Sequence, residues 1–243
     1  MLEPLRDLDW DTLKDRVATR IRRQILAGAI PPGFPLPEAR LAESLRVSRS
    51  TIRDGLHLLE REGLVVLRPR QAPIVRQLTA SEIGQTYEVR EILESKAADQ
   101  LARLDPVARE AATATLFEAI EALAEVHGGE QRARIDADLH FHESLVALSH
   151  NSILLETWQH LRFRLRLAML AAPSSVLKQA ATGAHTDIVE AINEADGSAA
   201  TALIADHFRY ASSLMAGPWA KATTQDVPPS VKLRQLDDHV GHD

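Results

Sequence analysis

The stretch of residues 36–67 constrains the fold of this chain more than any other part of the sequence. Leu41 and Leu45 lie four residues apart, which gives a first short helix one apolar face. Ser48 is placed to cap a second helix, because its hydroxyl can accept a free N–H of the first turn, and Gly63 is placed to end that helix. The apolar face of the second helix repeats at helical spacing through Ile52, Leu56 and Leu59. The pattern predicts two short helices joined by a tight turn.

The opposite face of the second helix is polar and basic at its N-terminal end. It carries four side chains that can hydrogen-bond to bases or phosphates, namely Arg49, Ser50, Thr51 and Arg53. The major groove of DNA admits one α-helix, and arginine can bind guanine with two hydrogen bonds. We therefore expect a helix-turn-helix that reads DNA, with further contacts from Arg40 and Arg70. The pattern alone also fits an ordinary helix pair with an arginine-rich solvated face.

The charge of the chain is divided unevenly. The total is −6, but residues 11–78 contain 13 Lys and Arg and 7 Asp and Glu, a net charge of +6, so the remainder carries −12. A basic segment on an acidic body is typical of a protein that binds nucleic acid through one of its parts.

Composition limits the other classes. The chain has no cysteine, so disulfides and thiolate metal sites are excluded. A hydrophobic content of 45% in 243 residues supports a core, and the abundance of Ala and Leu favours helices. We find no apolar run of 18 residues and no signal-peptide pattern. We therefore expect a cytoplasmic protein with no membrane partner.

The glycines and prolines that interrupt the helical patterns predict three parts, which are residues 1–78, 79–217 and 218–243. The elements expected in the first part are a helix at 10–28, the helix pair at 36–63 and two strands at 64–67 and 74–76. The basic, proline-containing connection between the strands predicts a wing that lies along phosphates. Together these elements predict a winged helix-turn-helix.

The second part reads as an all-α antiparallel helical bundle. Thr79 and Glu82 fit a capping box at its start. Six consecutive amphipathic helices are expected, at 79–103, 106–127, 130–149, 151–171, 174–195 and 197–216. The third part is polar and is expected to be disordered. The fold class is therefore mainly α.

Four potential metal ligands lie on the core-facing stripes of three of these helices. Asp138 and His142 are four residues apart, so both project from one helix face. His185 precedes two isoleucines at helical spacing, and His207 follows Leu203 by four residues. Burying these groups separately would be costly, whereas one divalent cation would satisfy them together. Spacing alone leaves open that the histidines are hydrogen-bonded core residues.

The metalloprotease class is excluded by one residue. His142-Glu143 begins the pattern H-E-x-x-H, but Val146 stands where the second histidine ligand belongs.

Four further residues are candidates for binding a carboxylate effector in a cavity of the bundle, and they are Arg90, Asn151, Arg162 and Arg166. Arg162 and Arg166 share a helix face, and Arg90 lies on the first helix of the bundle. The three arginines also fit an ion-paired surface, and Asn151 also fits a helix N-cap.

Over about residues 11–217 the chain resembles transcriptional regulators of the GntR superfamily, in the FadR-like branch with an all-helical FCD domain. In the N-terminal part the resemblance rests on Leu36-Pro37-Glu38, Leu41-Ala42, Val47-Ser48-Arg49, Arg53, Leu56, Leu59 and Glu62-Gly63-Leu64. In the C-terminal part it rests on Arg90 with Glu94, Asp138, Phe141-His142, Asn151, His185 and His207.

The resemblance implies roles for these residues. The segment from Arg49 to Arg53 matches the operator-contacting segment of the family. The family's metal ligands, commonly occupied by zinc or nickel, match Asp138, His142, His185 and His207. Members are typically homodimers on palindromic operators, and their effectors are usually small organic acids bound against the metal.

This sequence departs from the family pattern at the turn, in the recognition helix and in the wing. Arg46 stands where the family usually has a turn glycine, and Gly55 replaces the usual alanine. A glycine inside a helix costs about 0.5–1 kcal/mol relative to alanine. Gln71 replaces the usual glycine of the wing and Pro73 follows it, so the path of the wing is open.

We therefore expect a transcriptional repressor, not an enzyme, that a small carboxylate bound at a divalent metal releases from DNA. Two alternatives belong to other classes. One is a metal hydrolase with a DNA-binding appendage, since an Asp/His₃ site can activate water. The other is a metal-free helical dimerisation module with core histidines.

Overall fold

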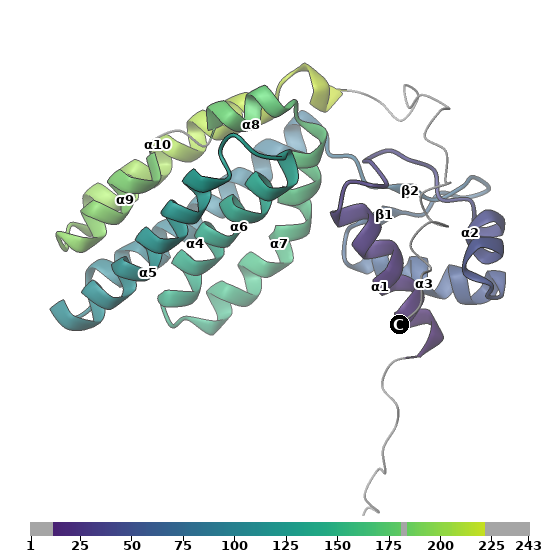
Figure 1. The fold of residues 1–243 in the computed structure, drawn as a ribbon, viewed down its shortest axis with the longest axis horizontal. Helices are drawn as coiled ribbons and strands as arrows, with labels where there is room; N and C mark the ends of the chain where they lie inside the picture. The colour runs from purple at the N-terminus through teal and green to yellow at the C-terminus, as the bar shows by residue number, and fades with distance from the viewer. Residues whose placement is uncertain (1–11, 181–183, 222–243) are drawn as a thin grey trace, which may run out of the picture. The chain divides into compact units, whose positions relative to one another are not determined.

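A computed structural model describes residues 12–180 and 184–221 of the chain. The chain forms two compact units, one before and one after the boundary at Arg76 and Gln77. The prediction of a mainly helical chain with an N-terminal helix-turn-helix and a C-terminal helical domain is confirmed (Figure 1). No helix of the described residues is long and apolar enough to cross a bilayer.

The described residues of the N-terminal unit form three helices and a two-stranded antiparallel sheet (Figure 1). Its elements are α1 (Leu13–Leu26), α2 (Glu38–Leu45), α3 (Arg49–Arg61), β1 (Val65–Val66) and β2 (Ile74–Val75). In the sheet Val65 pairs with Val75 and Val66 with Ile74. The strands are shorter than the sequence predicts, and the part of the first expected helix before Thr12 lies outside the described residues.

The turn between α2 and α3 follows the expected chemistry. The hydroxyl of Ser48 accepts a hydrogen bond from the backbone N–H of Thr51 at 3.1 Å, which confirms the predicted cap. Arg46 adopts the left-handed conformation, with φ of 53°, at the position where glycine is usual. This conformation costs an L-residue about 1–2 kcal/mol, so the turn carries strain that a glycine would not.

Gly55 lies where α1 packs closely against α3. A Cβ atom at Gly55 would be 2.8 Å from Cγ1 of Val17 and 3.2 Å from the carbonyl oxygen of Lys14. Both distances are shorter than ordinary contacts, so the missing side chain permits the close approach of the two helices. The glycine therefore serves packing here, which offsets its cost in helix propensity.

The wing is closed by an arginine side chain. Nε and Nη2 of Arg68 donate to the carbonyl oxygen of Ala72 at 3.1 and 2.8 Å. The residue with left-handed backbone is Arg70, with φ of 60°, and not Gln71, where the family usually has its glycine. Arg70 is exposed at the tip of the wing, whereas Arg68 is held within it.

The C-terminal unit is a bundle of helices (Figure 1). Its elements are α4 (Ala80–Ala102), α5 (Pro106–Glu125), α6 (Gln131–Leu148), α7 (Ser152–Ala171), α8 (Ser174–Ala180), α9 (Ala184–Asn193), α10 (Gly197–Met215) and the short 3₁₀ helix η1 (Pro218–Lys221). The single helix expected at 174–195 is described as α8 and α9, on either side of residues 181–183, which lie outside the described residues.

Side-chain caps begin several of these helices. Thr79 and Glu82 form the predicted capping box, with hydrogen bonds of 2.9 and 3.2 Å between side chain and backbone in both directions. Asn151 caps α7, because its side-chain oxygen accepts the N–H of Leu154 at 3.1 Å. These caps fix where the helices start and hence which faces meet in the core.

The apolar core of the bundle extends into the segment that the sequence assigns to the tail. Ala220 in η1 is buried and Trp219 packs against the core. Residues 218–221, at the start of the tail that the sequence predicts to be disordered, form η1, and Trp219 supplies apolar surface that packs against the core. Residues 222–243 lie outside the described residues.

Candidate functional site

Three imidazole rings meet inside the bundle. His142 of α6, His185 of α9 and His207 of α10 are buried, and one nitrogen from each lies within 4.8 Å of the other two. Nε2 of His142 and Nε2 of His185 are 3.2 Å apart. The structure thus brings together three residues that are far apart in the sequence.

Asp138 lies beside this histidine cluster. Its Oδ1 is 3.9 Å from Nε2 of His142 and 4.0 Å from Nε2 of His185. A cation about 2.1 Å from each ligand needs donor atoms about 3–4 Å apart, so these positions suit a shared ion. The one-turn spacing of Asp138 and His142 places both on the same face of α6, as the sequence predicts.

The three histidines are held in the neutral state that a metal ligand requires. Burial lowers the pKa of His185, and it lowers the pKa values of His142 and His207 well below 6.5. Nearby positive charge from Arg90 acts in the same direction on all three. Their lone pairs are therefore available for coordination at neutral pH.

Glu94 of α4 contacts His142 at the ring nitrogen that faces away from His185. Its Oε2 lies 2.5 Å from Nδ1 of His142, while its Oε1 accepts hydrogen bonds from Nε of Arg90 at 2.7 Å and Nε1 of Trp158 at 2.8 Å. A carboxylate that holds the far nitrogen of a histidine is the usual support of a metal ligand. This donor set and its support fit a divalent metal.

Glu94 has no place among the site residues expected from sequence. The available signal was its spacing of four residues from Arg90 on a helix that is otherwise apolar on this side. That spacing indicates an ion pair, but it does not show that the pair faces a histidine 48 residues away.

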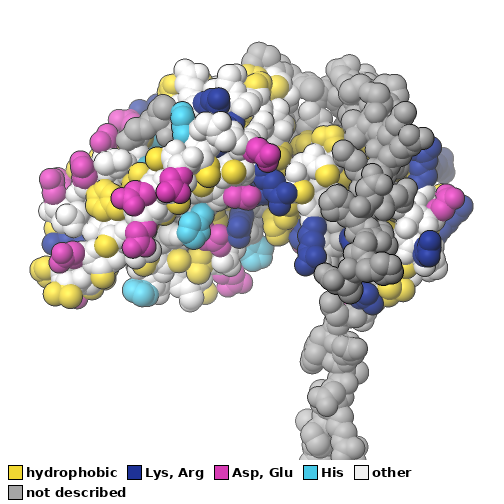
Figure 2. All heavy atoms as spheres, in the orientation of Figure 1, with side chains coloured by type: hydrophobic (Ala, Val, Ile, Leu, Met, Phe, Trp, Pro, Cys, Tyr) yellow, Lys and Arg dark blue, Asp and Glu magenta, His cyan; other side chains and the backbone are white. Residues whose placement is uncertain are grey.

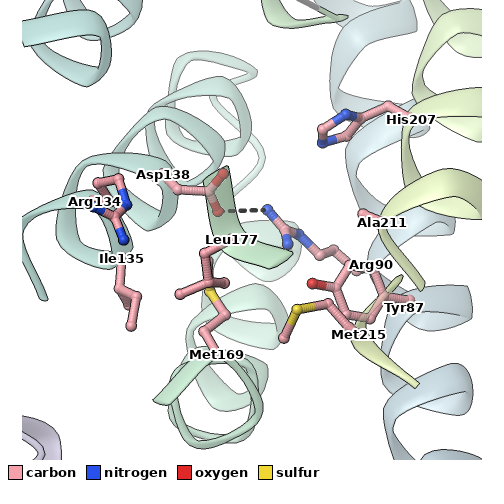
Figure 3. Close-up of a pocket in the computed structure, with 10 residues that line it drawn as sticks. All are labelled: Tyr87, Arg90, Arg134, Ile135, Asp138, Met169, Leu177, His207, Ala211 and Met215. Carbon is pink, nitrogen blue, oxygen red and sulfur yellow. Dashed lines mark ion pairs between the residues drawn. The ribbon is translucent and has the colours of Figure 1, made fainter. Parts of the chain in front are cut away.

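A cavity adjoins the histidine cluster (Figure 3). Arg90, Asp138 and His207 line it together with the hydroxyl-bearing Tyr87 and an arginine that the sequence analysis did not single out, Arg134. Nη2 of Arg90 is 3.9 Å from Oδ2 of Asp138. The remaining wall is apolar, so an acidic small molecule would contact charged side chains only at the two arginines and Asp138.

The structure places one of the four expected effector-binding residues, Arg90, in this cavity. The other three do not line this cavity. Asn151 caps α7, the half-exposed Arg162 pairs with Glu143, and Arg166 pairs with Asp136. Sequence spacing predicts which face of a helix an arginine lies on. It does not predict which carboxylate is nearest, and that carboxylate decides where the arginine side chain lies.

The candidate DNA-binding residues lie on the N-terminal unit. The side chains of Arg40, Arg49, Ser50, Arg53 and Arg70 are exposed, and that of Thr51 is half-buried. Arg53 makes two hydrogen bonds with Glu38 of α2, at 3.1 and 2.8 Å. On the visible face, Asp and Glu side chains are spread over the bundle, whereas Lys and Arg are the prominent charges of the N-terminal unit (Figure 2).

Two family models match the chain. One, described as "FCD domain", matches residues 85–210, and the other, described as "Bacterial regulatory proteins, gntR family", matches residues 13–75.

Curated relatives match most of the chain. An uncharacterized HTH-type transcriptional regulator from the TAR-I ttuE-ttuC' intergenic region of Agrobacterium vitis is 33% identical and covers 60% of this chain and 88% of its own. A probable D-xylose utilization operon transcriptional repressor of Paenarthrobacter nicotinovorans is 28% identical over 81% of this chain and 85% of its own. A gluconate operon transcriptional repressor of Bacillus licheniformis is 29% identical, and the match covers 68% of this chain and 66% of the repressor.

Solved structures share the fold. A putative GntR transcriptional regulator from Rhodococcus sp. RHA1 has a TM-score of 0.71 at 24% identity and covers 84% of this chain and 98% of its own. The Escherichia coli protein McbR/YncC has a TM-score of 0.65 at 21% identity, and the match covers 84% of this chain and 97% of McbR/YncC.

Proposed function

Because the chain belongs to the GntR family of bacterial regulatory proteins and carries an FCD domain, we propose that it is a metal-dependent repressor released from DNA by a small organic acid. Like its relatives, it is a transcriptional regulator and not an enzyme. The observation that carries the proposal is the cluster of three buried, neutral imidazoles at the edge of a cavity that contains a buried arginine.

The residues that would hold the metal are His142, His185, His207 and Asp138. Three nitrogen donors and one carboxylate suit zinc or nickel. The metal would supply a Lewis-acidic position for an oxygen of the effector. Glu94 would keep His142 in the tautomer whose Nε2 lone pair faces that position.

Arg90 would fix the orientation of the acid. Its Nη2 is buried and has no hydrogen-bond partner among the described residues, while its Nε is occupied by Glu94. A carboxylate in the cavity would accept this free donor, and charge-assisted hydrogen bonds of this kind are the strong ones.

The N-terminal end of α3 would enter the major groove of operator DNA. Arg49 and Arg53 would bind guanine, and Ser50, Thr51, Arg40 and the wing residue Arg70 would contact bases or phosphates. We propose a homodimer in the cytoplasm on a palindromic operator, with half-sites about one helical turn apart. The relatives named as repressors support the negative sign of regulation.

Effector binding would change DNA affinity by favouring one arrangement of the bundle over another. Such coupling is typically about 5–150-fold. The test is a screen of small carboxylates by thermal shift, with and without zinc or nickel, followed by operator binding at fixed salt. We expect stabilisation that needs both metal and acid, and release of the DNA at the same acid concentration. Stabilisation by acid in the presence of a chelator, or unchanged DNA binding with bound acid, would contradict the proposal.

A further inference from the structure

Arg134 of α6 is a buried cation without an anionic partner among the described residues. Its exposed fraction is 3%. Its two Nη atoms donate to the carbonyl oxygen of Gly129 and the hydroxyl of Ser174, and its Nε has no hydrogen-bond partner. Both acceptors are neutral, so the charge of the guanidinium is left uncompensated. A buried charge is costly unless it is paired.

The other buried arginines of the bundle are paired. Arg90 donates to Glu94, and Arg166 forms an ion pair with Asp136. Arg134 and Asp138 are four residues apart on α6, a spacing at which ion pairs commonly form. Asp138 nevertheless lies beside Arg90 and the histidines. The charge of Arg134 thus remains available to something outside the protein.

Arg134 lines the same cavity as Arg90 and Asp138. Figure 3 shows Asp138 between the two guanidinium groups in that view, with Ile135 and Leu177 on the wall below. The cavity therefore has one cationic group at the histidine side and a second one beyond Asp138, with apolar side chains beside them. A monocarboxylate would satisfy one of them and leave the other buried and unpaired.

We infer that Arg134 binds a second anionic group of the effector, so that the effector is a small dicarboxylic acid. The inference rests on the proposed function, because the first carboxylate is the one placed against the metal and Arg90. Both Nη atoms of Arg134 already donate to Gly129 and Ser174, so the unpaired Nε N–H is the donor that an acidic group would meet. A hydrogen bond from a guanidinium to a carboxylate is charge-assisted and therefore strong. The apolar side chains of Ile135 and Leu177 suit the short carbon chain between the two acidic groups.

The experiment compares acids that differ only in the second carboxylate. The full chain, loaded with zinc, is titrated calorimetrically with saturated dicarboxylates of three to six carbons, including succinate and glutarate. Each is compared with the monocarboxylate of equal carbon number, butyrate for succinate and valerate for glutarate. We expect wild-type protein to prefer a dicarboxylate by about 10–100-fold, the value of a hydrogen bond to a charged group. Arg134→Gln should lose that preference and bind the monocarboxylate unchanged.

Two variants serve as controls. Arg132→Gln removes a mostly exposed arginine of the same helix and should leave both affinities unchanged. Arg134→Lys keeps the charge but not the Nε donor. It should retain part of the preference, and it replaces Arg134→Gln if that variant does not fold. The zinc content of each variant is measured, because it must stay at the wild-type value for the comparison.

The outcomes separate the inference from the function beneath it. If wild-type protein shows no preference for the second carboxylate, or if Arg134→Gln weakens both acids of a pair equally, Arg134 is structural and the inference is wrong. The proposed function then stands. If wild-type protein binds no acid of either kind, both the proposed function and the inference are wrong.

Discussion

Oε2 of Glu94 lies 2.5 Å from Nδ1 of His142, and this contact leaves Nε2 of the ring facing His185. With the proton held on Nδ1, the lone pair of Nε2 is directed toward His185, whose Nε2 lies 3.2 Å away. The contact joins α4 to α6, so the first helix of the bundle orients a candidate metal ligand on the third.

Replacement of Glu94 by glutamine should therefore weaken metal binding. Loss of such a supporting carboxylate typically reduces metal affinity by about 10–100-fold. The affinity is measured by competition with a chromophoric chelator, with circular dichroism to confirm folding. Glu88→Gln, which alters an exposed residue of the same helix, is the matched control. Equal zinc affinity in Glu94→Gln and Glu88→Gln would show that the contact does not support the metal.

The metal-free protein should lose stability in acid. Burial lowers the pKa values of His142, His185 and His207 in the folded state, so below pH about 6.5 the unfolded chain binds protons that the folded chain does not. This stability is fully present above that pH and declines below it, by up to about 1.4 kcal/mol per pH unit for each histidine that stays neutral.

Urea unfolding in the presence of a chelator, between pH 8 and pH 5.5, measures this dependence. His207→Gln should flatten the decline, whereas His160→Gln, at an exposed histidine of α7, should not. A decline that is the same in both variants would place its origin in other groups.

Gly55→Ala should destabilise the N-terminal unit although alanine is the better helix former. The added methyl would meet Val17 at 2.8 Å, and overpacking costs about 1–3 kcal/mol, more than the gain of about 0.5–1 kcal/mol in propensity. In a Val17→Ala background the space is open, so the same change should be neutral or stabilising. Urea unfolding of the four proteins gives the coupling energy. Additive effects would contradict the close approach.

Arg49→Ala should reduce operator affinity. An arginine that reads guanine with two hydrogen bonds contributes about 1–3 kcal/mol of discrimination between bases. Arg61→Ala, at the exposed C-terminal end of the same helix, removes the same charge far from the expected groove. Fluorescence anisotropy at fixed salt, with operator and scrambled duplexes, should show a loss confined to the operator and to Arg49→Ala.

The parts of the site that sequence reasoning identified are those with local spacing. Asp138 with His142 reveals a shared helix face, and His185 and His207 each sit on an apolar stripe, so their burial could be expected. Ser48 and Thr79 were identified because a helix cap is a contact between residues three apart.

The parts that were missed depend on contacts between distant residues. Arg134 and Arg166 both lie on helices of the bundle, yet one lines the cavity and the other pairs with Asp136. Their own neighbours in sequence do not distinguish them. Glu94 was missed for the same reason. Trp219 was missed because η1 packs against α7 and the core, which are distant in the sequence.

The metal content of the purified chain shows whether the three buried histidines bind a metal ion. Elemental analysis of wild-type protein and of the His185→Ala/His207→Ala double variant, both folded by circular dichroism, compares the metal bound per chain. We expect one zinc or nickel ion per wild-type chain and loss of that ion from the double variant. Full metal occupancy in the double variant, or none in the wild type after gentle purification, would contradict it.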